Sequence, residues 1–134
     1  MTKDEIRKIL KENKTVAVVG MSSNPERPSQ QVPLYLRAHG YNVIPVNPKA
    51  TEIAGMKAYP DLLSIPEKVD VVEIFMRAEE VPLVVDQAIK IGAKVVWMQE
   101  GIVNEAAAAA AQAAGLTAVQ DMCMRATHRF LIGE

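Results

Sequence analysis

Five short apolar runs alternate with helix-patterned stretches along this chain. The runs occupy residues 15–20, 42–47, 69–76, 94–99 and 116–120. Continuous apolar runs are typical of strands that are buried on both faces of a sheet. Strands that alternate with helices form parallel sheets covered by helices on both sides. The pattern therefore predicts a three-layer α/β domain built on a five-stranded parallel sheet.

Capping residues indicate where several of the helices begin. Thr2 and Glu5 have the spacing of a capping box ahead of a first helix. Asn104 is placed to cap an alanine-rich helix, and a short final helix is expected over Arg125–Leu131. Helices at these places keep the alternation with strands intact to the end of the chain.

Two prolines restrict the elements that contain them. The second helix is expected to begin near Ser29 and to end at Gly40. Pro33 is expected in the first turn of that helix, because a proline deeper in a helix breaks a hydrogen bond. Pro45 lies in the second strand, and proline is awkward at the centre of a sheet. We therefore expect an irregularity or an unpaired position at Pro45.

Right-handed crossovers leave few possible strand orders for such a Rossmann-like domain. We expect the order 3-2-1-4-5, counting the runs along the chain, with the reversal between strands one and four. Ligands of these sheets bind at the carboxyl ends of the strands, beside the reversal. The ends concerned are Gly20–Ser23, Asn47–Lys49, Phe75–Arg77 and Gln99–Gly101.

Length, charge and composition exclude several classes of protein for this chain. The 134 residues suit one domain, 1–134, and the net charge of −1 gives no general attraction to nucleic acid or anionic lipid. No apolar run approaches the roughly 20 residues that span a membrane. The single cysteine, Cys123, excludes an intramolecular disulfide framework, and no Cys/His cluster suggests a metal. We expect a cytoplasmic protein without nucleic-acid or membrane partners; a protein partner or homo-oligomer remains open.

The segment from Gly20 to Ser29 follows the first strand directly and precedes a helix. It reads Gly-Met-Ser-Ser-Asn-Pro-Glu-Arg-Pro-Ser, so it lacks the G-x-G-x-x-G spacing of a dinucleotide site. Ser22, Ser23 and Asn24 supply hydroxyl and amide groups, and Arg27 supplies a forked cation that suits phosphate oxygens. The next helix points its positive dipole end at the same place. The segment predicts a phosphate-binding turn; the alternative is a polar surface loop.

The residues at the end of the second strand indicate which class of nucleotide the site suits. Sites for NAD usually carry an acidic residue there, which accepts hydrogen bonds from the ribose hydroxyls. This chain has Val-Asn-Pro-Lys at residues 46–49 instead. Lys49 suits an additional phosphate near the ribose, as in coenzyme A or NADP, although a solvated surface lysine is nearly as good an interpretation.

At this point the chain resembles a known family. The family is the CoA-binding domain of the succinyl-CoA synthetase α subunit, which also occurs alone in small bacterial CoA-binding proteins. The resemblance covers almost the whole chain and is carried by VVGMSSNPERPSQQV (18–32), VIPVNPK (43–49), YPDLLSIPEKVDVVEIF (59–75), GAKVVWMQEGI (92–102) and DMCMRATHR (121–129).

The resemblance implies that coenzyme A or an acyl-CoA is bound. Ser29, Gln30 and Gln31 look like the element that holds the nucleotide together with the loop after strand one. Pro48 and Lys49 would lie along the adenosine phosphate end.

The same resemblance implies roles at two further strand ends. The residues that would flank the adenine or the pantetheine are Phe75, Met76 and Arg77. Those that would border the pantetheine path are Gln99, Glu100 and Gly101. Gly20 itself starts the phosphate turn. Met21, like Met76, is expected to offer an apolar wall toward the ligand.

Catalysis is not expected from these residues. The synthetase needs a second domain with a phosphorylated histidine, and neither His39 nor His128 matches that role. No two carboxylates have the spacing of a general acid/base pair. Cys123 is interpreted as a small buried residue; a minor hypothesis is that it exchanges disulfides with bound coenzyme A.

Three functional hypotheses remain. The leading one is a CoA-binding module without catalysis of its own, serving as a carrier, a sensor or a regulatory subunit. The second is an NADP-linked or other nucleotide-dependent enzyme on the same fold. The third is an interaction protein whose bound nucleotide is only structural.

Overall fold

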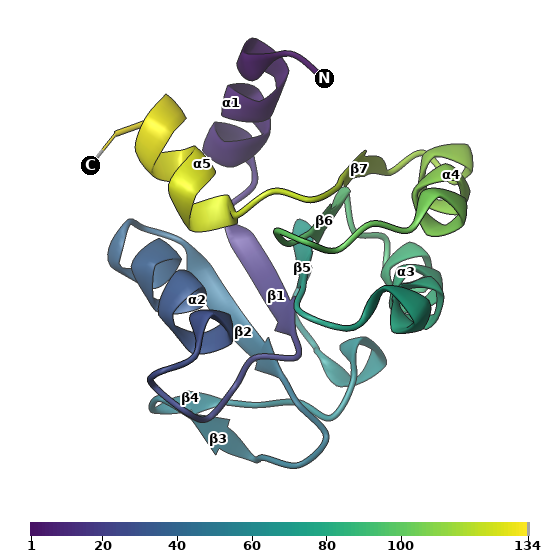
Figure 1. Ribbon diagram of the computed structural model, residues 1–134. Coiled ribbons are helices and arrows are strands. Elements are labelled where there is room, and N and C mark those ends of the chain that lie inside the picture. The colour runs from purple at the N-terminus through teal and green to yellow at the C-terminus, as the bar shows by residue number, and fades with distance from the viewer. Residues whose placement is uncertain (134) are drawn as a thin grey trace.

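The computed structural model describes residues 1–133, and a five-stranded parallel sheet lies at its centre (Figure 1). Its strands are β1 (Thr15–Val19), β2 (Asn42–Val46), β5 (Val71–Ile74), β6 (Val95–Met98) and β7 (Thr117–Val119). Helices cover one face: α1 (Lys3–Glu12), α2 (Pro28–Ala38) and α5 (Met124–Leu131). The other face carries α3 (Val81–Lys90) and α4 (Glu105–Ala113). The predicted three-layer α/β, Rossmann-like fold is confirmed.

The predicted helix caps are confirmed as well. The Thr2 hydroxyl accepts a hydrogen bond from the backbone of Glu5 at 3.1 Å, and the Glu5 carboxylate accepts one from the backbone of Thr2 at 2.6 Å. The Asn104 side chain accepts a hydrogen bond from the Ala107 N–H at 2.9 Å. Each cap satisfies backbone donors that a helix leaves free at its start.

The predicted strand order was wrong. The sheet has the order β2-β1-β5-β6-β7, so the third strand pairs with the first and not with the second. Between β2 and β5 the chain forms a small hairpin, β3 (Glu52–Ile53) with β4 (Met56–Lys57), and a 3-10 turn, η1 (Leu62–Ser64). A second 3-10 turn, η2 (Ala78–Glu80), precedes α3.

The outer edge of β2 explains this order. Tyr59 lies against that edge: its N–H donates to the Pro45 carbonyl at 3.0 Å, and its carbonyl accepts from the Asn47 N–H at 2.9 Å. Pro45 has no N–H to offer a further strand there, which is why proline is tolerated at a sheet edge. The fully buried β5 is therefore placed beside β1, where both of its faces are covered.

The corrected order moves the reversal to the boundary between β1 and β5. The chain leaves β1 through α2 on one face of the sheet and leaves β5 toward α3 on the other face. Because the two connections diverge, a crevice opens at the carboxyl ends of these two strands. This crevice, and not one beside the fourth strand, is where a ligand of this fold is expected.

Pro33 was also misplaced by the sequence analysis. Helix α2 begins at Pro28, so Pro33 lies inside the helix and beyond its first turn. A proline cannot donate to the carbonyl four residues earlier, which here belongs to Ser29. That carbonyl accepts a hydrogen bond from the Ser22 N–H instead, at 3.4 Å. The proline thus leaves an acceptor on the helix that ties down the loop after β1.

Two apolar clusters, one on each face of the sheet, form the core. The cluster under α1, α2 and α5 includes Leu10, Trp97 and Met124, all at most 1% exposed. Full burial of one large apolar side chain contributes roughly 1.5–3 kcal/mol. Helix α5 is further joined to α2 by a hydrogen bond between the Tyr35 hydroxyl and His128 Nδ1, 2.9 Å long.

No helix within residues 1–133 is long and apolar enough to cross a membrane. Within the same residues, no three His, Cys, Asp or Glu side chains are grouped so that they could hold a metal ion.

The contact between α2 and α5 gives a prediction for His128. Burial, with smaller contributions from His39 and Lys14, lowers the pKa of His128 below its usual 6.5. The neutral ring is therefore the form that the folded state favours, and its contribution to stability is present above pH 6.5 and is lost as the pH falls. The difference in unfolding free energy between the unmodified protein and His128→Gln should shrink from pH 7.5 to pH 5. Urea denaturation at several pH values measures it, and a constant difference would contradict the assignment.

Candidate functional site

Gly20 ends β1 at the crevice and brings β1 and β5 close together. Its φ angle is +87°, and a Cβ atom at this position would overlap the carbonyl oxygen of Phe75. The Gly20 N–H donates to the carbonyl of Val46 at 3.0 Å, and the Phe75 N–H donates to the carbonyl of Val19 at 2.9 Å. Only glycine fits here. Because Gly20 has no side chain, its backbone at the start of the loop is left uncovered for an incoming ligand.

The loop from Gly20 to Ser29 is ordered by its own short side chains. The Ser22 hydroxyl accepts from the Asn24 N–H at 3.0 Å, and the Asn24 side chain accepts from the Glu26 N–H at 2.9 Å. These bonds leave the N–H groups of Ser23 and Ser29 without an acceptor among the described residues. Free N–H groups beside a helix N-terminus form an anion-binding environment.

Gln30 anchors this loop to the helix that follows. Its side chain is 5% exposed and donates to the carbonyl of Ser22 at 3.0 Å. Together with the bond between the Ser22 N–H and the Ser29 carbonyl, this fixes both polar groups of the Ser22 backbone. The role of Gln30 is thus to hold the loop, and the neighbouring Gln31 supports it with a 3.3 Å bond to the carbonyl of Pro25.

Met21 differs from the sequence-based expectation. Its side chain is fully buried in the cluster under α2 and α5, so it does not form an apolar wall of the crevice. Its carbonyl accepts a hydrogen bond from the side chain of Asn47 at 3.0 Å. Met21 therefore contributes to the site through its backbone and through packing.

Asn47 is a site residue that the sequence analysis missed. Besides its bond to Met21, its side-chain oxygen accepts from the Lys49 N–H at 2.8 Å. Asn47 thereby joins the loop after β1 to the loop after β2 and orients Lys49. The signal in the sequence was an asparagine at a strand end directly before Pro48, a position that favours turns.

A cavity of about 200 Å³ lies on the α3 side of the crevice. Three residues expected in the site line this cavity: Gly20, Pro48 and Met76. The other lining residues are mostly apolar: Val19, Val46, Pro60, Asp61, Leu62, Leu83, Val84 and Gln87. Phe75 points to the other side of the sheet, where it packs against the α2 cluster. Successive residues of a strand face opposite sides, so Phe75 and Met76 are separated by the sheet itself.

The three cations expected in the site have different surroundings. Arg77 pairs with Glu80 at 3.0 Å and lies 4.0 Å from Glu79, and the hydrogen bond to Glu80 raises its pKa. Arg27 and Lys49 are exposed and have no carboxylate within ion-pair distance among residues 1–133. Arg27 and Lys49 are therefore available to an anionic ligand, whereas Arg77 is already partly neutralised.

The end of β6 reaches toward α5. Gln99 is 4% exposed, and its side-chain oxygen accepts from the Met124 N–H at 2.8 Å. Gly101 donates its N–H to the Asp121 carboxylate at 2.6 Å, and Glu100 between them is exposed. The three residues expected along the pantetheine path thus lie together at the same carboxyl edge as Gly20, with Gln99 on the α5 side of the sheet.

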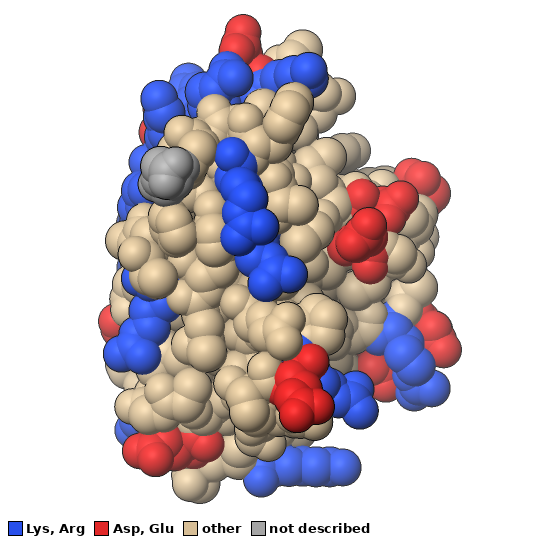
Figure 2. Space-filling view, turned by 60° about the vertical axis from the view of Figure 1, so that its left-hand side comes forward, with Lys and Arg blue, Asp and Glu red and all other residues tan. Residues whose placement is uncertain are grey.

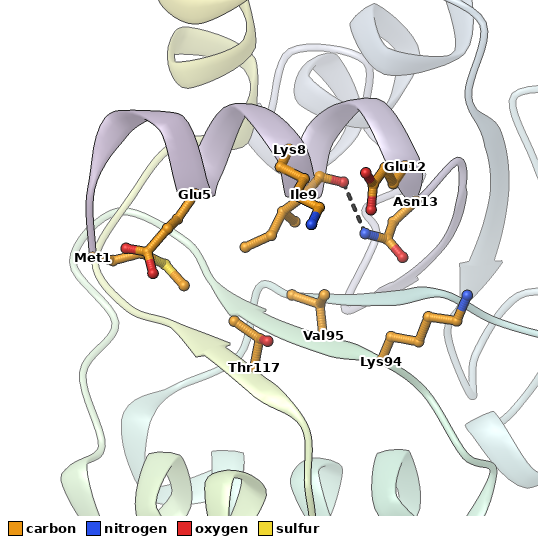
Figure 3. A pocket seen from close by; sticks show the side chains of 9 residues that line it. All are labelled: Met1, Glu5, Lys8, Ile9, Glu12, Asn13, Lys94, Val95 and Thr117. Carbon is orange, nitrogen blue, oxygen red and sulfur yellow. Dashed lines mark hydrogen bonds between the residues drawn. The ribbon is translucent and has the colours of Figure 1, made fainter.

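A second cavity, of about 460 Å³, lies at the opposite edge of the sheet (Figure 3). It is enclosed by α1 and by the amino ends of β6 and β7, with Lys8, Glu12, Lys94 and Thr117 among its lining residues. Basic and acidic side chains are mixed there, and none of the residues expected in the site takes part.

A model of the CoA binding domain family matches residues 14–129. The chain belongs to the CoA binding domain family. The resemblance noted from the sequence is therefore confirmed. Uncharacterized protein YneT of Bacillus subtilis is 39% identical over 127 residues, which are 95% of this chain and 94% of YneT.

Members of this family occur at different lengths. A solved structure of a hypothetical protein from Pyrococcus horikoshii is 46% identical, with a TM-score of 0.97 and coverage of 99% of this chain and 94% of that one. The ADP-forming acetate–CoA ligase II of Archaeoglobus fulgidus is 36% identical over 83 residues, 60% of this chain. The matched part is only 12% of the ligase. The same CoA binding domain thus occurs in chains of this size and within a much longer enzyme.

The contact at Gly20 gives a prediction for the fold of the site. Gly20→Ala should lower the unfolding free energy by about 3 kcal/mol or more, because it adds steric overlap with Phe75 to an unfavourable positive φ. Gly40→Ala is the matched control: Gly40 also has a positive φ, +93°, but has open space around it. It should cost about 1–2 kcal/mol. Equal losses for the two variants in urea denaturation would show that the approach of β5 is unimportant.

Proposed function

We propose that this chain, as one domain over residues 1–134, binds coenzyme A or an acyl-CoA at the crevice between β1 and β5, without catalysing a reaction itself. The observation that carries the proposal is the pair of unpaired cations, Arg27 and Lys49, beside a loop with free N–H groups in a member of the CoA binding domain family. Coenzyme A offers a diphosphate and a ribose phosphate, which are two separate anionic groups for two separate cations.

The diphosphate is assigned to the loop and the start of α2. The free N–H groups of Ser23 and Ser29 provide hydrogen-bond donors, and the positive end of the α2 dipole favours negative charge there. Arg27 directly precedes α2 and can offer two parallel donors to phosphate oxygens. No side chain caps this helix within the described residues, which leaves its N-terminus available.

The ribose phosphate is assigned to Lys49. Asn47 orients the turn that carries this lysine, and the end of β2 has no carboxylate of the kind that NAD sites use for the ribose hydroxyls. A lysine ammonium attracts a phosphate as a compact point charge. This arrangement therefore favours a nucleotide that carries a phosphate on its ribose.

The two remaining parts of the ligand are assigned by shape and polarity. The cavity of about 200 Å³ next to Gly20, with Pro48 and Met76 in its wall, suits a flat aromatic ring such as adenine. The pantetheine arm would then run along the carboxyl edge toward Gln99, Glu100 and Gly101. The two assignments use opposite ends of the crevice, as an extended ligand requires.

Binding without catalysis is the simpler role for these residues. The segment shared with the Archaeoglobus ligase is a small part of that enzyme, so its activity does not transfer with the domain. Of the cations at the crevice, Arg77 is engaged by two glutamates, and the free cations Arg27 and Lys49 suit recognition of phosphate. A carrier or sensor of coenzyme A needs no more than this.

Titration calorimetry tests the proposal. Coenzyme A should bind, and Arg27→Ala and Lys49→Ala should each weaken its affinity about tenfold, which corresponds to about 1.4 kcal/mol. Lys49→Ala should affect coenzyme A more than 3′-dephospho-CoA, which lacks the ribose phosphate. Lys68→Ala, an exposed lysine at the amino end of β5, is the control and should bind like the unmodified protein.

Two results would overturn this function. Heat on titration with NADP but none with coenzyme A or acetyl-CoA would favour a nucleotide-dependent enzyme. Turnover of acetyl-CoA by the purified protein would contradict the absence of catalysis.

A further inference from the structure

Glu73 is a buried carboxyl group without a partner. It lies in β5, it is 0% exposed, and neither of its carboxyl oxygens has a hydrogen-bond partner among the described residues. An unpartnered buried polar group destabilises the folded state, so such a group calls for an explanation. Burial raises the pKa of Glu73 to about 8, so its proton stays on at neutral pH.

The neighbours of Glu73 on β6 are also the residues that hold α5. In the sheet register Glu73 lies between Val18 of β1 and Trp97 of β6, and these two pack in the cluster under α2 and α5. Gln99 directly follows β6 and continues that face, because side chains alternate along an extended chain. Trp97 and Gln99 are thus the side and diagonal neighbours of Glu73.

Residues Met122–Leu131, here called the α5 lid, are attached to the sheet through these neighbours. The indole N–H of Trp97 donates to the carbonyl of Met122 at 2.8 Å, and the Met124 N–H donates to Gln99 at 2.8 Å. A backbone bond from the Met122 N–H to the carbonyl of Met98, 3.3 Å long, adds to these two. Among the described residues, the hydrogen bonds from the start of the lid to the sheet thus all go to residues 97–99, next to Glu73.

The rest of the lid rests on two other helices. His128 bonds to the Tyr35 hydroxyl of α2 at 2.9 Å, and Arg7 of α1 donates to the carbonyl of Leu131 at 3.1 Å. Helix α5 takes no part in the ladder between the described strands, so it can move without breaking that ladder. The face that includes the lid carries several exposed basic side chains (Figure 2).

The charged and titratable groups on this face come from the lid, from α1 and α2, from the loops around them and from the end of β6. None of them hydrogen-bonds to the Glu73 carboxyl. They include Cys123, Arg125, His128 and Arg129 of the lid, Lys3, Asp4, Arg7 and Lys11 of α1, Lys14, Arg27, Tyr35, Arg37, His39, Tyr41 and Glu100. Cys123 and His128 belong to the lid, and the ring of His39 lies 5.3 Å from that of His128, so these three side chains need controls.

We propose that the α5 lid is a proton-controlled closure of the site: it stays on Trp97 and Gln99 while Glu73 keeps its proton, and loss of that proton to solvent favours its opening. An unpaired carboxylate cannot remain in an apolar core, because burial of an isolated charge is very costly. Trp97 pairs with Glu73 in the sheet and is held, like Gln99, by the start of the lid, so lifting the lid loosens the neighbours of the carboxyl group and opens a path for water.

Proton linkage fixes the direction and size of the effect. In the closed state the group holds its proton up to about pH 8, whereas a solvated glutamate releases it near the ordinary value of 4.5. The closed state therefore binds one more proton than the open state between these values. The opening equilibrium should rise tenfold for each pH unit up to about pH 8 and then level off.

Opening also affects the proposed site, and this consequence rests on the proposed function. Closure holds the Gln99 side chain in place through the Met124 N–H, beside the expected pantetheine path, and opening releases it. A ligand that binds the closed arrangement must then favour closure. Coenzyme A should therefore raise the protection of the lid.

Hydrogen exchange of individual backbone amides from pH 6 to pH 9 tests the lid directly. After correction for intrinsic exchange, protection of the Met124 and Thr127 amides should fall about tenfold per pH unit up to pH 8 in the unmodified protein. Glu73→Gln should give a flat profile, and so should Glu73→Leu if the first variant folds poorly. An unchanged slope in both variants would overturn the proposal.

Low concentrations of urea separate lid opening from global unfolding. Exchange of the lid amides should be nearly independent of urea, because little surface is exposed, whereas amides of β1 and β5 should respond. Equal protection and equal urea dependence in lid and core would overturn the proposal.

Control variants and a measurement with coenzyme A exclude other titrating groups and distinguish failure of the lid from failure of the proposed function. Cys123→Ser, His39→Gln and His128→Gln should keep the pH slope, and its loss in any of them would assign the effect to that side chain and contradict the role of Glu73. Coenzyme A that binds without protecting the lid would refute the link to the site. If coenzyme A does not bind, the proposed function fails, and the exchange slope still decides whether the lid exists.

Discussion

The close approach of β5 to Gly20 is the contact on which the rest of the site depends. The carbonyl of Phe75 lies where residue 20 would carry a side chain, so β1 and β5 end side by side with only backbone between them. The chain diverges from this point to opposite faces of the sheet, and the crevice follows from that divergence. A larger residue at position 20 would push apart the two strand ends that define the crevice.

The loop after β1 gains its shape from a defect in the helix that follows it. Pro33 leaves the Ser29 carbonyl without a helical donor, and the Ser22 N–H takes that place. Gln30 and Asn47 hold the loop from two further directions. An ordered loop keeps its free N–H groups in position before a ligand arrives, which lowers the entropic cost of binding. Pro33 is unfavourable for the helix, but the carbonyl that it leaves free helps to order the loop of the site.

Local patterns predicted most of the secondary structure, and long-range contacts decided what they missed. Apolar runs located the five strands, and short-range capping located the starts of α1 and α4, because these signals lie within a few residues. The strand order was not predictable in this way, since right-handed crossovers permit both orders. It depends on Tyr59 occupying the edge of β2, where it contacts Pro45, a residue 14 positions earlier in the chain.

In the candidate site, too, local patterns predicted some features, and long-range contacts decided the others. The types of residue and their places, in the loop after β1 and at the end of β2, identified Arg27 and Lys49 as candidate cations, and neither has an ion-pair partner within residues 1–133. The direction of a side chain was harder to predict: Met21 points into the core, and Arg77 is held by Glu80. Asn47 was missed because its importance comes from the two loops that it joins.

The central claim is that a CoA binding domain uses the carboxyl edge between β1 and β5 to hold its ligand. The most direct measurement is a titration of the isotope-labelled protein with coenzyme A, followed by the NMR shifts of individual backbone amides. The account predicts the largest shifts at residues 20–29, at Asn47 and Lys49, and at residues 99–101. Shifts centred on Lys94 and Thr117, at the amino edge, would place the ligand in the other cavity and contradict the account.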